Sequence, residues 1–153
     1  MTPKITLTEA PDNGMIKALA KKLAHFNDVK SGRPIDYRSL AIFLTHPDTD
    51  ELLGGLFGST QYSILHIDLL FVPEEMRGAG LGRQLMEQAE QEAVQRGCHA
   101  AWLDTFSFQA PSFYERLGYT VFGTLQDYLP GHSRFFLRKT LEPGNASILQ
   151  SPR

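Results

Sequence analysis

The sequence predicts one α+β domain with a mixed central sheet that is mostly antiparallel and contains one parallel strand pair. Apolar runs joined by short turns, near both ends of the chain, are typical of antiparallel hairpins. In the middle, residues 64–105 follow the order strand, helix, strand, which is typical of a parallel crossover. At 153 residues the chain is long enough to bury one sizeable core.

The N-terminal part predicts a strand, a helix and a hairpin. Ile5–Leu7 alternates apolar and polar residues, as in a strand, and apolar residues then recur at helical spacing over Ile16–Phe26. Asn27–Asp36 is polar and contains glycine and proline, which predicts a loop. Ser39–Leu44 and Leu52–Ser59 are apolar runs on either side of a turn, so they predict an antiparallel hairpin.

The centre of the chain predicts the parallel crossover. Ile64–Val72 is an apolar strand that is stopped by Pro73. Leu81–Arg96 has apolar residues on one face and polar residues mostly on the other, which predicts an amphipathic helix. His99–Thr105 predicts the next strand, so these elements form one strand–helix–strand unit.

The C-terminal part predicts a short helix and a closing hairpin. Ala110–Leu117 carries proline in its first turn and is followed by glycine, which is typical of a helix. Tyr119–Leu125 and Arg134–Leu141 predict two paired strands, and Gln126–His132 predicts the loop between them. The order of elements predicts helices on both faces of the sheet. Residues 143–153 are polar, contain proline and glycine, and predict a loose tail after the domain at 1–142.

Composition limits the classes of partner. A net charge of −2 argues against nucleic acid or an anionic membrane as the main partner. Cys98 is the only cysteine, so an intrachain disulfide is impossible. The chain has no apolar run that could span a bilayer and starts without the apolar core of a signal peptide, which predicts a cytoplasmic protein. No cluster of residues shows metal-ligand spacing, so we expect no metal.

A glycine-rich loop between the central strand and its helix predicts an anion site. Glycines at such a junction leave backbone N–H groups uncovered, and the helix dipole directs its positive end to the same place. The helix start carries Arg83 and no acidic residue, which also suits an anion. Phosphate is the anion most often bound in this way.

Three phosphate-binding patterns compete for this loop. The P-loop pattern fails because no lysine and hydroxyl pair follows the glycines. The dinucleotide pattern starts at Gly78 and Gly80, but Arg83 stands at the position of its third glycine. The pattern Gln/Arg-x-x-Gly-x-Gly/Ala is filled by Arg77, Gly80 and Gly82.

This last pattern resembles the acyl-CoA loop of the GNAT superfamily of N-acetyltransferases. The resemblance includes Val72-Pro73 before the loop and Leu85 after it, and it extends over about Ile5–Leu141. It implies the GNAT fold, in which the parallel strand pair splays apart and admits the pantetheine arm of acetyl-CoA. It implies acetyl-CoA as the cosubstrate, with its pyrophosphate on the loop amides.

The resemblance implies three sets of cofactor-binding residues. The loop contributes Arg77, Gly78, Ala79, Gly80, Leu81, Gly82 and Arg83. The strand before it contributes Leu70, Phe71 and Val72, and main-chain groups of Leu70 and Val72 are expected to pair with the pantetheine arm. The third set is Phe113 with Ser107, which stands where many family members carry asparagine.

A second motif implies the general acid. Ala110-x-x-Phe113-Tyr114-x-x-x-Gly118-Tyr119 resembles the family pattern Ala-x-x-Phe-Tyr-x-x-x-Gly-Phe/Tyr, whose tyrosine hydroxyl points at the CoA sulfur. This implies that Tyr114 protonates the departing thiolate. A tyrosine with an ordinary pKa of about 10 suits donation to a thiolate of similar basicity.

The general base stays open at this stage. His66, Asp68, Leu70 and Val72 share one face of the central strand if it alternates regularly. His66 stands where histone-type family members carry a carboxylate, and an imidazole can accept a proton near neutral pH. Asp68 is a second candidate, either as base or as binder of the substrate ammonium group, and Asp104 is a third. Ordered water without a dedicated base is the remaining alternative.

These observations predict an N-acetyltransferase that moves an acetyl group from acetyl-CoA to a primary amine of a small molecule or peptide, by direct attack in a ternary complex. A non-catalytic acyl-CoA sensor on the same fold is the alternative. A nucleotide-binding oxidoreductase is a further rival, against which Arg83 argues. Asp68, Asp104 and Asp127 suggest a cationic acceptor. The resemblance also suggests a homodimer.

Overall fold

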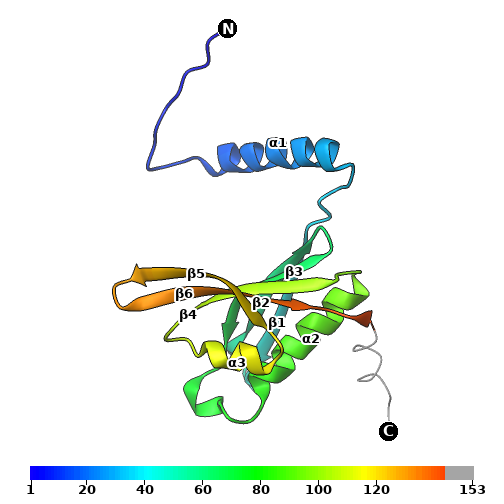
Figure 1. Ribbon diagram of the computed structural model, residues 1–153, viewed down its shortest axis with the longest axis vertical. Coiled ribbons are helices and arrows are strands. Elements are labelled where there is room, and N and C mark those ends of the chain that lie inside the picture. Colours follow the sequence, from blue (N-terminus) through cyan, green and yellow to red (C-terminus); the bar gives the residue numbers. More distant parts are fainter. Residues whose placement is uncertain (144–153) are drawn as a thin grey trace. The chain divides into compact units, whose positions relative to one another are not determined.

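The computed structural model describes residues 1–143 of the chain (Figure 1). Met1–Ile35 forms one compact unit, and the residues from Asp36 on form another. Each unit is described by itself, and the single domain expected over residues 1–142 stays a prediction. The predicted tail lies, from residue 144 on, outside the described residues.

The first unit contains the helix α1 (Asn13–Ser31). The side chain of Asp12 caps its start by accepting a hydrogen bond from the amide of Met15, at 3.0 Å. Gly32 closes its end in the left-handed conformation, with φ of 68°, and donates its N–H to the carbonyl of Asp28. The helix is therefore delimited by a cap at each end.

Two predictions for the first unit are wrong. The loop predicted at 27–36 begins only at Gly32, because polar residues continue the helix until a glycine ends it. The strand predicted at 5–7 does not form. Residues 1–35 hold no other strand, and a strand needs a partner to satisfy its backbone groups.

Over the described residues from Asp36 on, the chain forms a six-stranded mixed sheet in the order β1-β2-β3-β4-β6-β5 (Figure 1). Its strands are β1 (Arg38–Thr45), β2 (Leu52–Gln61), β3 (Ile64–Phe71), β4 (Ala100–Phe106), β5 (Thr120–Leu129) and β6 (His132–Thr140). β3 and β4 pair in parallel, and the other neighbours pair in antiparallel fashion. The predicted α+β fold with one parallel pair is therefore confirmed.

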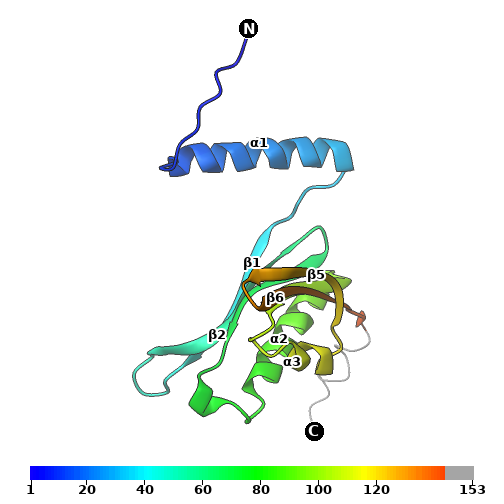
Figure 2. The same ribbon diagram turned by 60° about the vertical axis from the view of Figure 1, so that its left-hand side comes forward.

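Two helices of the second unit cover the same face of this sheet. These are α2 (Leu81–Gln95) and α3 (Pro111–Arg116), and a short 3₁₀ turn, η1 (Glu74–Met76), precedes α2 (Figures 1 and 2). The most deeply buried large side chains beneath them are Leu56, Leu65, Met86, Leu103, Tyr119 and Leu137. This face is the core face of the sheet.

The parallel pair separates before either strand ends. Pairing between β3 and β4 stops at Ile67 and Leu103. β3 continues beside β2 to Phe71, and β4 continues beside β6 to Phe106. The two C-terminal strand ends therefore diverge, and they leave between them the gap that the splayed pair predicts.

A β-bulge at Asp68 changes which way the end of β3 faces. The residues on both sides of Asp68 pair with β2, but Asp68 itself has no partner there. One extra residue in a strand turns every later side chain to the other face. Leu70 and Val72 accordingly pack against the core. The prediction that they share a face with His66 and Asp68 is therefore wrong.

The C-terminal hairpin is longer than predicted. β5 continues to Leu129, so most of the loop predicted at Gln126–His132 is strand, and the chain reverses at Pro130-Gly131. The pairing with β6 shifts between Leu125 and Leu129. Asp127, at a φ of 49°, lies in this irregularity, which lets the strand resume after the polar residues.

A cluster of three polar side chains joins α2 to the C-terminal strands. The hydroxyl of Tyr119 donates a hydrogen bond of 3.0 Å to Glu90 of α2, and Lys139 of β6 binds the other carboxylate oxygen of Glu90 at 2.8 Å. Burial, together with the Glu90 carboxylate, raises the pKa of Tyr119, so its hydroxyl keeps the donated proton. The group holds the helix and the sheet in one register.

Replacing Tyr119 with Phe should destabilise the protein by about 1–3 kcal/mol, because one oxygen of the partly buried Glu90 carboxylate loses its donor. Urea denaturation measures the change. Tyr62→Phe, at a tyrosine that is 38% exposed, is the control and should change the stability little. Equal stabilities of Y119F and Y62F would show that the Glu90 contact contributes nothing.

Candidate functional site

A cavity of about 1000 Å³ occupies the gap between the diverging ends of β3 and β4. Its walls are the end of β3, the loop before α2, the end of β4 and the start of α3, with Arg134 from β6. Clefts at such a point collect side chains and main-chain groups from several elements. The cavity is therefore the candidate site.

The loop before α2 presents uncovered amides to this cavity. Gly78 and Gly80 adopt φ of 83° and 80°, a conformation that favours glycine. Within residues 1–143 no group accepts a hydrogen bond from the amides of residues 78–83, and α2 starts without a side-chain cap. The loop residues that line the cavity are Arg77, Gly78, Gly80, Leu81, Gly82 and Arg83. Ala79 does not line it.

Two arginines flank these amides in different ways. Arg77 turns back on the loop and donates its Nε–H to the carbonyl of Val72, at 3.0 Å. That carbonyl is therefore taken, and the main-chain pairing expected at Val72 could use only its N–H. Arg83 lies 3.6 Å from Glu87, one turn along α2, and about half of its side chain is exposed.

Tyr114 of α3 lines the cavity from the core face. The rings of Phe113 and Tyr119 pack edge-on against it and hold it in place. Its hydroxyl has no hydrogen-bond partner within the described part of the chain. Burial and, to a smaller extent, the carboxylate of Asp104 raise the pKa of Tyr114 to about 12. The side chain is therefore a protonated donor at neutral pH.

His66 and Asp68 lie together, but only Asp68 lines the cavity. His66 Nδ1 is 3.2 Å from Asp68 Oδ1, and the imidazole stacks on Trp102 of β4 with ring centroids 3.8 Å apart. His66 Nε2 is buried without a partner. His66 Nε2 is therefore enclosed, and of these two side chains only that of Asp68 lies at the cavity.

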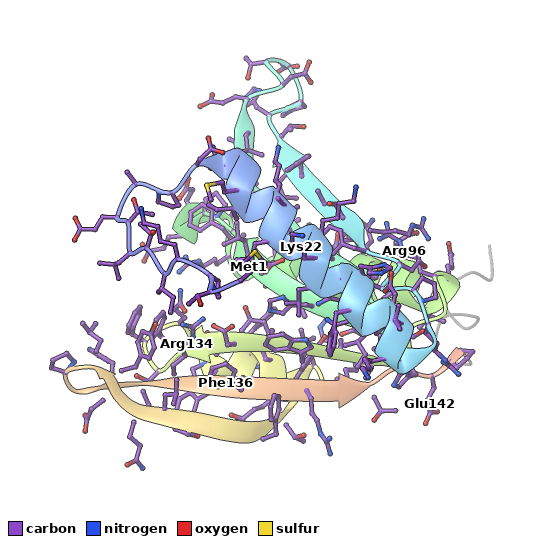
Figure 3. The ribbon with its side chains drawn as sticks, turned by 90° about the horizontal axis from the view of Figure 1, so that it is seen from above. Met1, Lys22, Arg96, Arg134, Phe136 and Glu142 are labelled. Carbon is purple, nitrogen blue, oxygen red and sulfur yellow. The ribbon has the colours of Figure 1, made fainter. Side chains whose placement is uncertain are left out.

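Asp104 is engaged by a cation. Arg134 donates its Nε–H to Asp104 at 2.7 Å and places Nη2 2.6 Å from the same oxygen, and the hydrogen bond raises the pKa of Arg134. The guanidinium also lies over the rings of Phe106, Tyr128 and Phe136. Arg134 and Phe136 are labelled in Figure 3. This pairing argues against Asp104 as the base.

Comparison with known proteins now identifies the family. The sequence profile of the acetyltransferase (GNAT) family matches residues 14–119. The chain belongs to the GNAT family. It is an acetyl-CoA-dependent acetyltransferase, as the resemblance in the glycine loop and the tyrosine motif predicts.

Individual relatives agree with this assignment. Blasticidin-S acetyltransferase from Streptomyces morookaense is 41% identical over 110 residues, 70% of this chain and 81% of that protein. Acetyltransferase Atu2258 from Agrobacterium fabrum is 38% identical over 133 residues, 87% of this chain and 96% of that protein. The crystal structure of an acetyltransferase from Agrobacterium tumefaciens is similar, with a TM-score of 0.83 at 37% identity, over 90% and 99% of the two chains.

The GNAT site fits acetyl-CoA on two observations. The uncovered loop amides suit a pyrophosphate, and the gap between β3 and β4 extends from them to Tyr114 and Asp68.

Among the described residues no group of three or more His, Cys, Asp or Glu could hold a metal ion. None of the helices described is long and apolar enough to cross a membrane.

Ser107 does not line this cavity. Its hydroxyl accepts a hydrogen bond from the amide of Ser133 at 3.2 Å and lies 3.3 Å from His132 Nδ1. It therefore ties β4 to the β5–β6 turn, and the geometry does not favour the cofactor contact expected of it. Asp127, expected near the pocket, does not line the cavity either.

Phe108, Gln109 and Arg134 are among the cavity residues that the sequence reasoning did not assign to the site. Gln109 Oε1 accepts the amide of Phe106 at 3.0 Å, so it caps the end of β4. The sequence contains one signal for Arg134, which stands directly before Phe135 and Phe136 at the start of the predicted last strand. Its meaning depended on the pairing of β4 with β6, which brings Arg134 to Asp104.

Gly82 offers a test of the loop. A Cβ at this position would lie 3.1 Å from Cζ of Phe113, across the cavity wall. Gly82→Ala should therefore displace the ring or the helix start and raise the KM for acetyl-CoA roughly tenfold, which corresponds to about 1.4 kcal/mol. Gly123→Ala is the control, since its Cβ would meet Phe136 at an ordinary 3.9 Å. Equal KM values for G82A and G123A would show that the Phe113 ring accommodates the added methyl group without disturbing the loop.

Proposed function

We propose that this GNAT protein acetylates a primary amine of a small molecule or peptide by direct attack of the amine on acetyl-CoA in a ternary complex. One observation carries the proposal. A single cavity joins uncovered phosphate-binding amides, a protonated tyrosine and an acceptor-facing carboxylate. These are the groups that acyl transfer from a thioester to an amine requires.

The loop and the splayed strands would hold the cosubstrate. The amides of residues 78–83 would receive the pyrophosphate, and Leu70, Phe71 and Val72 would flank the arm that carries the thioester. When bound, acetyl-CoA supplies an activated acyl group with a thiolate leaving group. A main-chain N–H at the end of β3 would polarise the thioester carbonyl.

Asp68 would receive the substrate. A protonated amine has no lone pair, so it must lose a proton before the new C–N bond can form. The Asp68 carboxylate attracts the ammonium group and accepts this proton directly or through water. His66, at 3.2 Å from Asp68, would position the carboxylate rather than take the proton itself.

Tyr114 would complete the reaction. As the C–S bond breaks, the sulfur gains the electron pair and needs a proton. The phenol of Tyr114 holds its proton at neutral pH, and no group of the described chain competes for it. Phe113 would support Tyr114 and the helix start at Gly82 together.

The lone cysteine supports direct transfer. Cys98 is buried, and burial raises the pKa of its thiol, which lowers the thiolate fraction. It does not line the cavity. An acyl-cysteine step is therefore not needed for the chemistry, and the amine would attack the thioester itself.

A small molecule is the favoured acceptor. Blasticidin-S acetyltransferase, which is 41% identical, is named for a small molecule. The carboxylate of Asp68 lines the cavity and suits a cationic amine.

A panel of amines incubated with acetyl-CoA tests the proposal, with release of free thiol as the measurement. The panel should contain aliphatic amines, ring-bearing amines and a peptide with a free N-terminus. At least one class should raise thiol release above the rate without amine. If no class does so although CoA binds tightly, the protein is an acyl-CoA-binding module and the proposal is wrong.

A further inference from the structure

An aromatic wall lies where the cavity meets the end of β4 and the β5–β6 hairpin. We define it as Phe106, Phe108 and Tyr128. Phe106 and Phe108 line the cavity, and Tyr128 contacts Phe106. None of these rings belongs to the buried core, since Phe108 and Tyr128 are more than half exposed.

The wall contains one pair of stacked rings. The rings of Phe106 and Phe108 are nearly parallel, at an interplanar angle of 5° and a centroid distance of 5.2 Å. Tyr128 tilts against Phe106 at 5.4 Å, and Arg134 lies 5.5 Å from the same ring. Phe108 also packs against His132, with ring centroids 5.0 Å apart and an interplanar angle of 84°, and it stays 56% exposed.

The segment that carries the wall is fixed although it is exposed. The amide of Ser107 donates to the carbonyl of Ser133 at 2.9 Å, and the amide of Ser133 returns a bond to the Ser107 hydroxyl. Gln109 and Phe106 bond to each other twice, through the Gln109 side chain and its main-chain amide. A ligand that binds here therefore does not have to order the loop.

Exposed aromatic rings held rigidly at a cavity wall favour a flat ligand. Aromatic rings prefer offset-stacked or edge-on neighbours, which a planar ring can supply and a puckered saturated ring cannot. We propose that the acceptor is a primary amine that carries a planar unsaturated ring, with the ring on Phe108 and the amine at Asp68. This inference rests on the proposed function for the transfer of the acetyl group to the amine. The contact with the ring can be measured by binding alone.

A matched pair of amines tests the ring contact. 2-Phenylethylamine and 2-cyclohexylethylamine have the same chain and the same number of carbons, but only the first carries a planar ring. Calorimetry on the CoA-saturated protein measures their binding, and thiol release from acetyl-CoA measures their kcat/KM. The phenyl amine should bind roughly twofold to tenfold more tightly, although the cyclohexyl amine is the more apolar.

Two variants locate the preference. Phe108→Leu keeps an apolar side chain but removes the ring. The ratio of the affinity for the phenyl amine to that for the cyclohexyl amine should therefore fall to about one. Phe122→Leu is the matched control, because Phe122 is also 56% exposed but does not line the cavity, and it should keep the wild-type preference.

The outcomes separate this inference from the proposed function. A wild type that prefers the cyclohexyl amine or binds neither amine overturns the inference, as does an F108L variant that keeps the wild-type ratio. Acetylation of both amines with equal kcat/KM and equal affinity overturns the inference and leaves the function standing. A ring preference in binding, with no thiol release from this pair or from any other amine of the panel, supports the ring contact and overturns the proposed function.

Discussion

Replacing Tyr114 with Phe should lower kcat by roughly 100-fold to 10,000-fold, the usual contribution of a positioned general acid. The phenol lies in the cavity, and without it the departing thiolate loses the proton donor that we propose for it. Binding of CoA, measured by calorimetry, should change little, because the ring that packs against Phe113 and Tyr119 is kept.

Tyr62→Phe is the matched control, since Tyr62 lies outside the cavity. A kcat for Y114F that equals that of Y62F would exclude Tyr114 as the acid.

The pH dependence of the wild-type rate gives a second check on Tyr114. Because the pKa of Tyr114 is raised to about 12, the acid stays protonated over the alkaline range in which an ordinary tyrosine, at about 10, begins to ionise. The wild-type rate should therefore not fall between about pH 8 and about pH 10 through loss of this proton.

Replacing Asp68 with Asn should lower kcat/KM for the amine roughly 100-fold or more, the contribution expected of a general base. The substitution keeps the size of the side chain and removes the charge that would attract an ammonium group and accept its proton. The KM for acetyl-CoA should stay close to that of the wild type, because the loop amides are unchanged.

Raising the pH tests both roles of Asp68 together, because each role acts on a protonated amine. An amine that is already deprotonated in solution needs no base, so the deficit of D68N should shrink as the pH approaches the pKa of the amine. Asp50→Asn, in the β1–β2 turn, is the control, and it should behave as the wild type. If D68N is as active as D50N at neutral pH, water or another group takes the proton.

His66 and Asp68 show which structural features local sequence patterns can predict and which they cannot. Both residues could be assigned to the central strand from the sequence, and both do lie in β3. Regular alternation then predicted one common face with Leu70, which the bulge at Asp68 prevents. A bulge depends on how two strands pair, and no local pattern in β3 reveals it. The parallel pairing of β3 with β4 places His66 against Trp102, whereas Asp68 lies at the cavity.

The sequence by itself determined the parts of the protein that depend on neighbouring residues. The glycines at 78, 80 and 82, the helix that follows them and the Phe113-Tyr114 motif are local patterns, because backbone conformation and helix periodicity are set within a few residues. These were sufficient to predict the fold and the family.

Only the tertiary structure decided which polar groups are free to act. Ser107 is tied to Ser133, and Asp104 is neutralised by Arg134, which lies 30 positions away in the chain. Such partners are chosen by strand order and register, which bring distant segments together by packing rather than by local preference. The position of Asp68 at the cavity and the aromatic residues that line the same cavity therefore cannot be predicted until the sheet is assembled.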